Sequence, residues 1–71
     1  MTITIIRSKQ VPDRIELISQ ALPGFPDQWG VRHRDTNRTV WLAHKQWAIE
    51  SYELINDDLD VEDTFGFQKV A

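Results

Sequence analysis

The stretch that decides the fold is WGVRHRDTNRTVWLAHK, residues 29–45. Two segments flank Asp35-Thr36-Asn37-Arg38, the first with Trp29 and Val31 and the second with Thr39, Val40 and Trp41. Asp and Asn favour turns because their side chains bond nearby backbone, and Asn tolerates the left-handed conformation. The sequence therefore predicts a β-hairpin with strands at 29–34 and 39–44.

The register of this hairpin decides which side chains reach solvent. A two- or four-residue loop pairs His33 with Val40 and Trp29 with His44, which places the apolar residues on one face. The reverse face then carries Arg32 directly opposite Trp41, with arginines around the indole. We predict a recognition patch on this hairpin, made of Arg32, Arg34, Arg38 and Trp41.

Four further segments predict regular structure. The β-branched run at 2–7 is typical of a strand. Residues 12–22 read as a helix, with Pro12 at the first helical position and Val11, Ile15, Ile18 and Leu22 at helical spacing. A second helix is predicted from about Lys45 to Asn56, and residues 64–70 as a possible last strand.

The predicted fold class is therefore α+β, a small antiparallel sheet with two helices on one face. The order is β-α-β-β-α with a possible final β. With the last strand the chain would be a miniature ferredoxin-like domain. Without it, a three-stranded sheet, two helices and an acidic tail remain.

The composition predicts one small soluble domain over residues 1–71. Hydrophobic residues make up 41% of the chain and charged residues 27%, which is ordinary for a globular protein. The chain has no cysteine, so neither a disulfide nor a thiolate metal site is expected. The first residues do not resemble a signal peptide, and no apolar run is long enough to span a bilayer. We expect a cytoplasmic protein that does not associate with membranes.

Charge divides the chain into two parts. Residues 1–45 hold seven Lys/Arg against four Asp/Glu, whereas residues 46–71 hold one against seven, so the two parts carry +3 and −6. Such asymmetry indicates either electrostatic partners or two parts that neutralise each other. The acidic segment 56–63, expected to be mobile, supplies three further candidate binding residues: Asp57, Asp58 and Asp60.

The sequence predicts neither a metal site nor a cofactor. In the predicted register His33 and His44 lie roughly 13 Å apart at about 3.3 Å per residue, too far to share an ion. The acidic segment lacks the glycine and the final glutamate of a calcium loop. The serines have no nucleophile-elbow motif, and the three glycines form no phosphate cradle.

Three functions remain as hypotheses. The first is a non-enzymatic protein-binding or regulatory module, of the accessory-subunit or inhibitor type, acting through the basic hairpin face and the acidic segment. The second is a single-stranded nucleic-acid binder that stacks bases on Trp41. The third is a small ribonuclease-like toxin using His33 or His44. An exposed edge strand, at 2–7 or 64–70, could also form a homodimer.

Overall fold

The computed structural model describes residues 2–10 and 13–66 and contains four strands followed by two helices. The bounds of these elements are β1 (Thr2–Lys9), β2 (Ile15–Leu22), β3 (Phe25–His33), β4 (Arg38–Leu42), α1 (Lys45–Leu54) and α2 (Asp58–Phe65).

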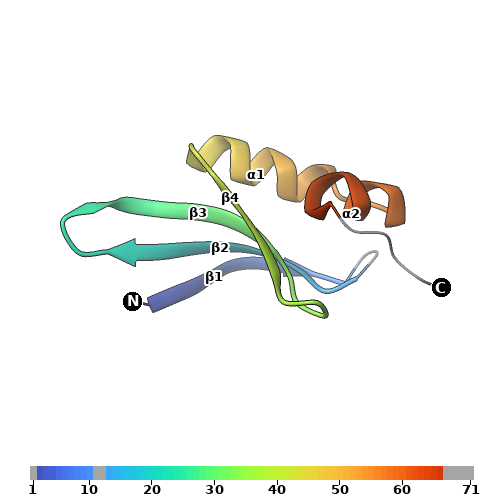
Figure 1. Ribbon diagram of the computed structural model, residues 1–71, viewed down its shortest axis with the longest axis horizontal. Coiled ribbons are helices and arrows are strands. Elements are labelled where there is room, and N and C mark those ends of the chain that lie inside the picture. The colour runs from blue at the N-terminus through green and yellow to red at the C-terminus, as the bar shows by residue number, and fades with distance from the viewer. Residues whose placement is uncertain (1, 11–12, 67–71) are drawn as a thin grey trace.

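The strands form one antiparallel meander in the order β1-β2-β3-β4. Both helices lie against the same face of this sheet, and no described helix covers the opposite face, which we call the open face (Figure 1). The α+β class, with an antiparallel sheet and two helices, is therefore confirmed. The observed order is β-β-β-β-α-α, so the predicted β-α-β-β-α order and its ferredoxin-like arrangement are not confirmed.

The prediction of a helix at residues 12–22 is wrong, because residues 15–22 form strand β2. Ile15 and Leu17 point toward the helices, while Glu16 and Ile18 point to the open face, and all four are buried. A strand that is buried on both faces gives a nearly continuous apolar run, and such a run also satisfies helical spacing. Gly24, at φ 77°, provides the turn into β3.

The predicted hairpin exists, but its register is shifted by two residues. Trp29 pairs with Leu42 and His33 with Arg38, around a four-residue turn at 34–37. Because the shift is even, it keeps most side chains on their predicted faces. His44 is the exception: it lies beyond β4 as the N-cap of α1 and is exposed, with its ring 4.6 Å from that of Trp47.

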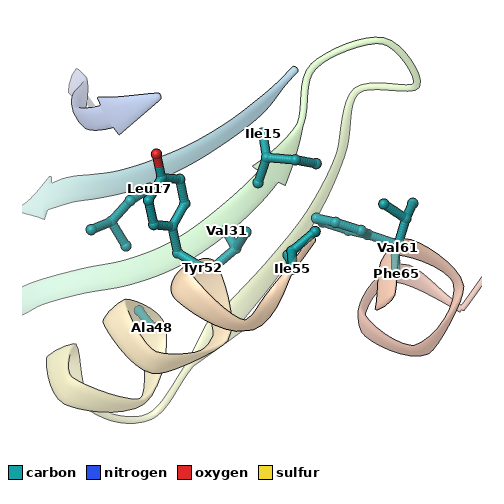
Figure 2. Packing of buried hydrophobic residues seen from close by; sticks show 8 residues of the cluster. All are labelled: Ile15, Leu17, Val31, Ala48, Tyr52, Ile55, Val61 and Phe65. Atoms are coloured by element: carbon teal, nitrogen blue, oxygen red, sulfur yellow. The ribbon is translucent and has the colours of Figure 1, made fainter. Parts of the chain in front are cut away.

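The hydrophobic core lies between the sheet and the two helices (Figure 2). Strand β2 contributes Ile15 and Leu17, and β3 contributes Val31. The helical side of the core consists of Ala48, Tyr52, Ile55, Val61 and Phe65. A core of this size is typical of a short chain, which leaves much of its apolar surface outside.

Helix α1 confirms the predicted second helix at 45–56 and is tied to β1 through Lys9. The Lys9 ammonium donates a hydrogen bond to the Tyr52 carbonyl oxygen at 2.6 Å, near the C-terminal end of α1. A cation is favourable there because it complements the helix dipole. Desolvation lowers the pKa of Lys9, against the opposing effect of Glu53 and Asp60.

The acidic segment forms the start of helix α2 and is not a loop. The Asp57 carboxylate accepts from the Asp60 N–H at 2.9 Å, and the Asp60 carboxylate accepts from the Asp57 N–H at 3.2 Å. This reciprocal capping box satisfies two N–H groups at the helix start, where acids also complement the dipole. The predicted mobility of 56–63 stays a prediction. Of the strand predicted at 64–70, Thr64 and Phe65 belong to α2, and residues 67–70 lie outside the described residues.

Replacing the cap residue should weaken α2 measurably. We expect Asp57→Ala to lower the free energy of unfolding by about 1 kcal/mol, because it leaves the Asp60 N–H without its acceptor. Urea denaturation followed by circular dichroism measures this change. Asp63→Ala, an exposed position later in the same helix, is the matched control and should change stability by less than about 0.5 kcal/mol. Equal losses in the two variants would contradict the capping role.

The two helices of the described chain, ten and eight residues long, are both too short to cross a bilayer.

Candidate functional site

The open face of the sheet carries side chains that are aligned in rows across the strands. One row runs through all four strands because the pairings Ile5–Ile18, Ile18–Gly30 and Gly30–Trp41 are in register. We call Ile5, Ile18, Gly30 and Trp41 the apolar row. Ile3 lies on the same face of β1, opposite Gln20, so the apolar surface continues toward the end of the sheet.

The Trp41 indole covers the centre of the apolar row. A Cβ atom placed on Gly30 would lie 2.8 Å from Trp41 Cε3 and 2.8 Å from the Val40 carbonyl oxygen. The indole therefore lies directly over the Gly30 backbone, which only glycine permits. Ile18, the next residue in the row, is fully buried although neither α1 nor α2 covers this face. Trp41 itself stays 39% exposed, Ile3 41% and Ile5 45%.

A second row, next to the apolar row, contains an ion-pair cluster. Glu16 pairs with Arg32 across β2 and β3 and accepts from its Nε at 2.7 Å. Its second carboxylate oxygen accepts from Arg34 at 3.0 Å. Burial by itself raises the pKa of Glu16, but the hydrogen bonds and charges of Arg32 and Arg34 outweigh it, so that the pKa is lowered. One buried carboxylate therefore neutralises part of the charge of both arginines.

The structure brings together three of the four residues of the predicted recognition patch. Arg32, Arg34 and Trp41 all lie at the open face, but Arg32 is opposite Thr39 and not opposite Trp41. Arg38 pairs with His33 on the face that the helices cover, so it does not belong to this surface. One acid of β2, Glu16, pairs with both Arg32 and Arg34.

His33, predicted to lie on the face with the apolar residues, is buried at one end of the sheet. Its ring contacts Asp13, which precedes β2, and Thr36, which lies in the turn between β3 and β4. The Thr36 N–H donates to His33 Nδ1 at 3.2 Å, which leaves the ring proton on Nε2. Nε2 then donates to the Asp13 carboxylate at 2.9 Å. The ring of Phe65 packs against the imidazole at 5.6 Å. The histidine thus links the residues before β2 to the turn before β4.

The carboxylates of Asp13 and Asp35 lie near the His33 ring, and one possible ligand atom from each of the three residues lies within 4.8 Å of the others, a spacing that suits a cation. Two observations favour a structural role instead. A metal ion on Nε2 would place the ring proton on Nδ1, where it would face the Thr36 N–H that now donates to this nitrogen. Asp35 is already bonded to the Arg14 guanidinium, with Nε at 2.8 Å, and that interaction lowers the pKa of Asp35.

A hollow of about 270 Å³ lies beside the ion-pair cluster. Its lining residues are Ser8, Lys9, Gln10, Arg14, Ile15, Glu16 and Arg34. Arg14 and Arg34 would suit an anion, but Asp35 and Glu16 already bind their guanidinium groups. An anion in this hollow would have to compete with these carboxylates, which makes it a poor binding site.

The acidic candidates lie at the start of α2, and two of them have structural roles. Asp57 and Asp60 form the capping box, and Asp58 lies in the first turn. Exposed acids without such a role are found elsewhere on the helices. In the part of the chain that the structure describes, no ion pair joins Glu50, Glu53 or Asp63 to a basic side chain.

Sequence reasoning missed Glu16, Ile18, Gly30 and the isoleucines of β1 as parts of one surface. The available signal was the Ile15-Glu16-Leu17 alternation, which has the two-residue period of a strand. A second signal was Gly30 inside a predicted strand, since such a glycine often marks close approach of another group.

Comparison with known proteins found no family model, no curated protein and no solved structure that matches this chain.

Proposed function

We propose that this protein is a non-enzymatic protein-binding module, of the accessory-subunit or inhibitor type, and that it binds its partner through the open face of the sheet. The observation that carries the proposal is the apolar row, in which Trp41 is held in place on Gly30 yet remains partly exposed. A fixed aromatic side chain loses little conformational entropy when a partner covers it.

The residues around Trp41 have the composition of a protein-binding surface. Protein interfaces are enriched in tryptophan and arginine near their centres, and apolar contacts surround these residues. Ile5 in the row and Ile3 beside it supply exposed apolar area, and Arg32 and Arg34 in the ion-pair cluster supply donors. A partner that covers this face would remove the exposed apolar surface from water.

The ion-pair cluster favours a protein partner over a nucleic acid. A phosphate backbone is bound by cationic groups that exchange counterions. Here Arg32 is mostly buried against Glu16, with its side chain only 19% exposed, and Arg34 shares the same carboxylate. The nucleic-acid hypothesis therefore has less support. The toxin hypothesis has less support too, because His33 is buried with both nitrogens bonded.

The acidic outer surface of the helices supports a second way of binding a protein. Residues 45–66 hold seven acids against one lysine. Leu54 and Leu59 are exposed among them, at 71% and 69%. A basic partner could cover this surface, and the acids would steer its approach. The variant that tests this surface is Glu50→Lys/Glu53→Lys/Asp63→Lys, which leaves the α2 capping box intact.

The two exposed tryptophans give a matched test of the proposal. A partner is first captured with the wild-type protein, identified by mass spectrometry and purified, and its affinity is then measured by calorimetry. We expect Trp41→Ser to weaken binding at least about 30-fold, the equivalent of about 2 kcal/mol for a central interface residue. Trp47→Ser removes a 53% exposed indole from α1 and should leave the affinity within about twofold.

The outcomes separate the two surfaces. Equal affinities of the wild type and Trp41→Ser would overturn the proposal that the open face binds the partner. Loss of binding by the triple lysine variant, with Trp41→Ser unaffected, would assign the partner to the acidic helices. Circular dichroism spectra that match the wild type establish that each variant is folded.

A further inference from the structure

Strand β1 is an edge of the sheet with one side unpaired. It pairs with β2 on one side, and no other described strand lies along its second side. Residues 2–8 of this strand are all exposed. A strand edge of this kind presents N–H and C=O groups that can pair with another strand.

The two halves of this edge differ in composition. Thr2 to Ile6 are uncharged and all β-branched, whereas Arg7 and Lys9 follow in the second half. Ile6 is an extra residue in a β-bulge, because Ile5 pairs with Ile18 and Arg7 with Leu17. Charges and bulges are common means of preventing edge-to-edge pairing. The charges lie only in the second half and the bulge lies at the boundary between the halves, so the regular stretch from Thr2 to Ile5 is open to strand addition.

The uncharged half is complementary to itself. In an antiparallel pairing about a two-fold axis at Thr4, Ile3 of one copy lies opposite Ile5 of the other, and Thr4 lies opposite Thr4. Paired β-branched side chains stabilise antiparallel strands. The overlap from Thr2 to Ile6 contains no charge, so the two Arg7 side chains do not face each other.

The arrangement of the helices leaves this edge accessible. The end of the sheet that contains the start of β1 extends past α1, at the left of Figure 1. A two-fold axis perpendicular to the sheet places the helices of both copies on one side. The open faces of both copies then form one continuous surface, on which Ile3 and Ile5 of the two copies meet.

We infer that two copies of this chain associate through the first half of β1, with Thr4 opposite Thr4, to form a continuous eight-stranded sheet. The inference goes beyond the proposed partner binding and does not depend on it, because it rests on the strand edge and not on Trp41. The contact is small, so the dimer forms in a concentration-dependent equilibrium.

Light scattering coupled to size exclusion tests the association. The wild-type protein should approach twice the 8.3 kDa of one chain as its concentration rises. Thr4→Lys and Thr4→Glu should each remain at the mass of one chain, because like charges then lie directly opposite each other. An equimolar mixture of the two variants should regain the dimer mass. Thr4 is exposed on an edge strand, so neither substitution should prevent folding.

A cysteine cross-link tests the register, since the chain has no cysteine of its own. Thr4→Cys should form a disulfide-linked dimer under mild oxidation, because opposed residues in antiparallel strands bring their Cβ atoms into bonding range. Ser8→Cys lies on the same strand outside the overlap and should not cross-link at a comparable rate.

Several results would overturn the inference: a wild-type mass of one chain at every concentration, a dimer that both Thr4 charge variants retain, or equal cross-linking at positions 4 and 8. If the protein stayed a monomer but bound an added peptide strand at β1, that result would also show that a second copy is not what pairs with this edge. The outcome of these tests does not bear on the effect of Trp41→Ser on partner affinity. The two proposals are therefore tested independently.

Discussion

Replacing Glu16 by alanine is expected to lower the free energy of unfolding by about 3 kcal/mol, more than any other single substitution proposed for this chain. Removing one partner of a buried ion pair costs about 3–5 kcal/mol, because the other charge remains without compensation. The lower end applies because Arg34 is half exposed and water can hydrate it, whereas Arg32 is mostly buried. Chemical denaturation at neutral pH measures the change. A loss below about 1 kcal/mol, the usual range of surface pairs, would show that the cluster contributes little.

The contribution of Glu16 should depend on pH in one direction. Its folded-state pKa lies below the ordinary value of 4.5, so folding favours the ionised form. Such a group stabilises the protein fully above its unfolded-state pKa, and this stabilisation is lost as the pH falls through the folded-state pKa. The difference in stability between the wild type and Glu16→Gln should therefore be constant near neutrality and shrink below about pH 4.5. A difference that grows on acidification would contradict the assignment.

Replacing Gly30 by alanine should destabilise the protein by about 2 kcal/mol. The new methyl group would meet both the Trp41 ring and the Val40 carbonyl oxygen at 2.8 Å, and the carbonyl belongs to a paired strand that cannot easily move. Overpacking of this kind costs about 1–3 kcal/mol. The indole should also shift, which changes the tryptophan fluorescence spectrum together with the denaturation midpoint.

A double substitution separates the two contacts at Gly30. If the ring accounts for part of the cost, Gly30→Ala should be less damaging in a Trp41→Ala background than in the wild type. The remaining cost then reports on the Val40 carbonyl oxygen. If Gly30→Ala were neutral in the wild-type background, the indole would not lie on the Gly30 backbone, and the fixed position of Trp41 in the proposed binding surface would be lost.

The predictable part of the fold was the segment in which local signals agree. In the hairpin at 29–45, alternation, turn residues and a following helix all pointed to one arrangement, and the structure differs mainly by a two-residue register shift. The shift arises because turn residues tolerate several four-residue loops, and only packing selects among them. Helix α1 was predictable because its apolar stripe extends over several turns.

Residues 12–22 could not be assigned from local pattern because their environment is created by other strands. Ile18 is buried only because Ile5 and Gly30 pair with β2 on either side and the Trp41 ring lies over Gly30. Glu16 is tolerated at a buried position only because two arginines from the region of the hairpin turn reach it. Both facts depend on tertiary structure, which overrides local propensity.

The roles of the acidic residues depend on local structure instead. A cluster of aspartates in sequence suggested a binding segment, yet Asp57 and Asp60 bond backbone N–H groups at the start of α2. The signal for this was present as an Asp followed three residues later by another Asp before an apolar residue, which resembles a capping box. The usual Glu or Gln is replaced by Asp60, whose shorter side chain still reaches the Asp57 N–H.

The meander order of the sheet also has a consequence for the kinetics of folding. Each strand pairs with the strand that is its neighbour in the sequence, so every strand pair closes only a short loop. Short loops cost little chain entropy, and proteins with such local pairing cross their folding barrier rapidly. The sheet can grow one hairpin at a time, and the two helices, which come last in the chain, can then dock on a surface that already exists.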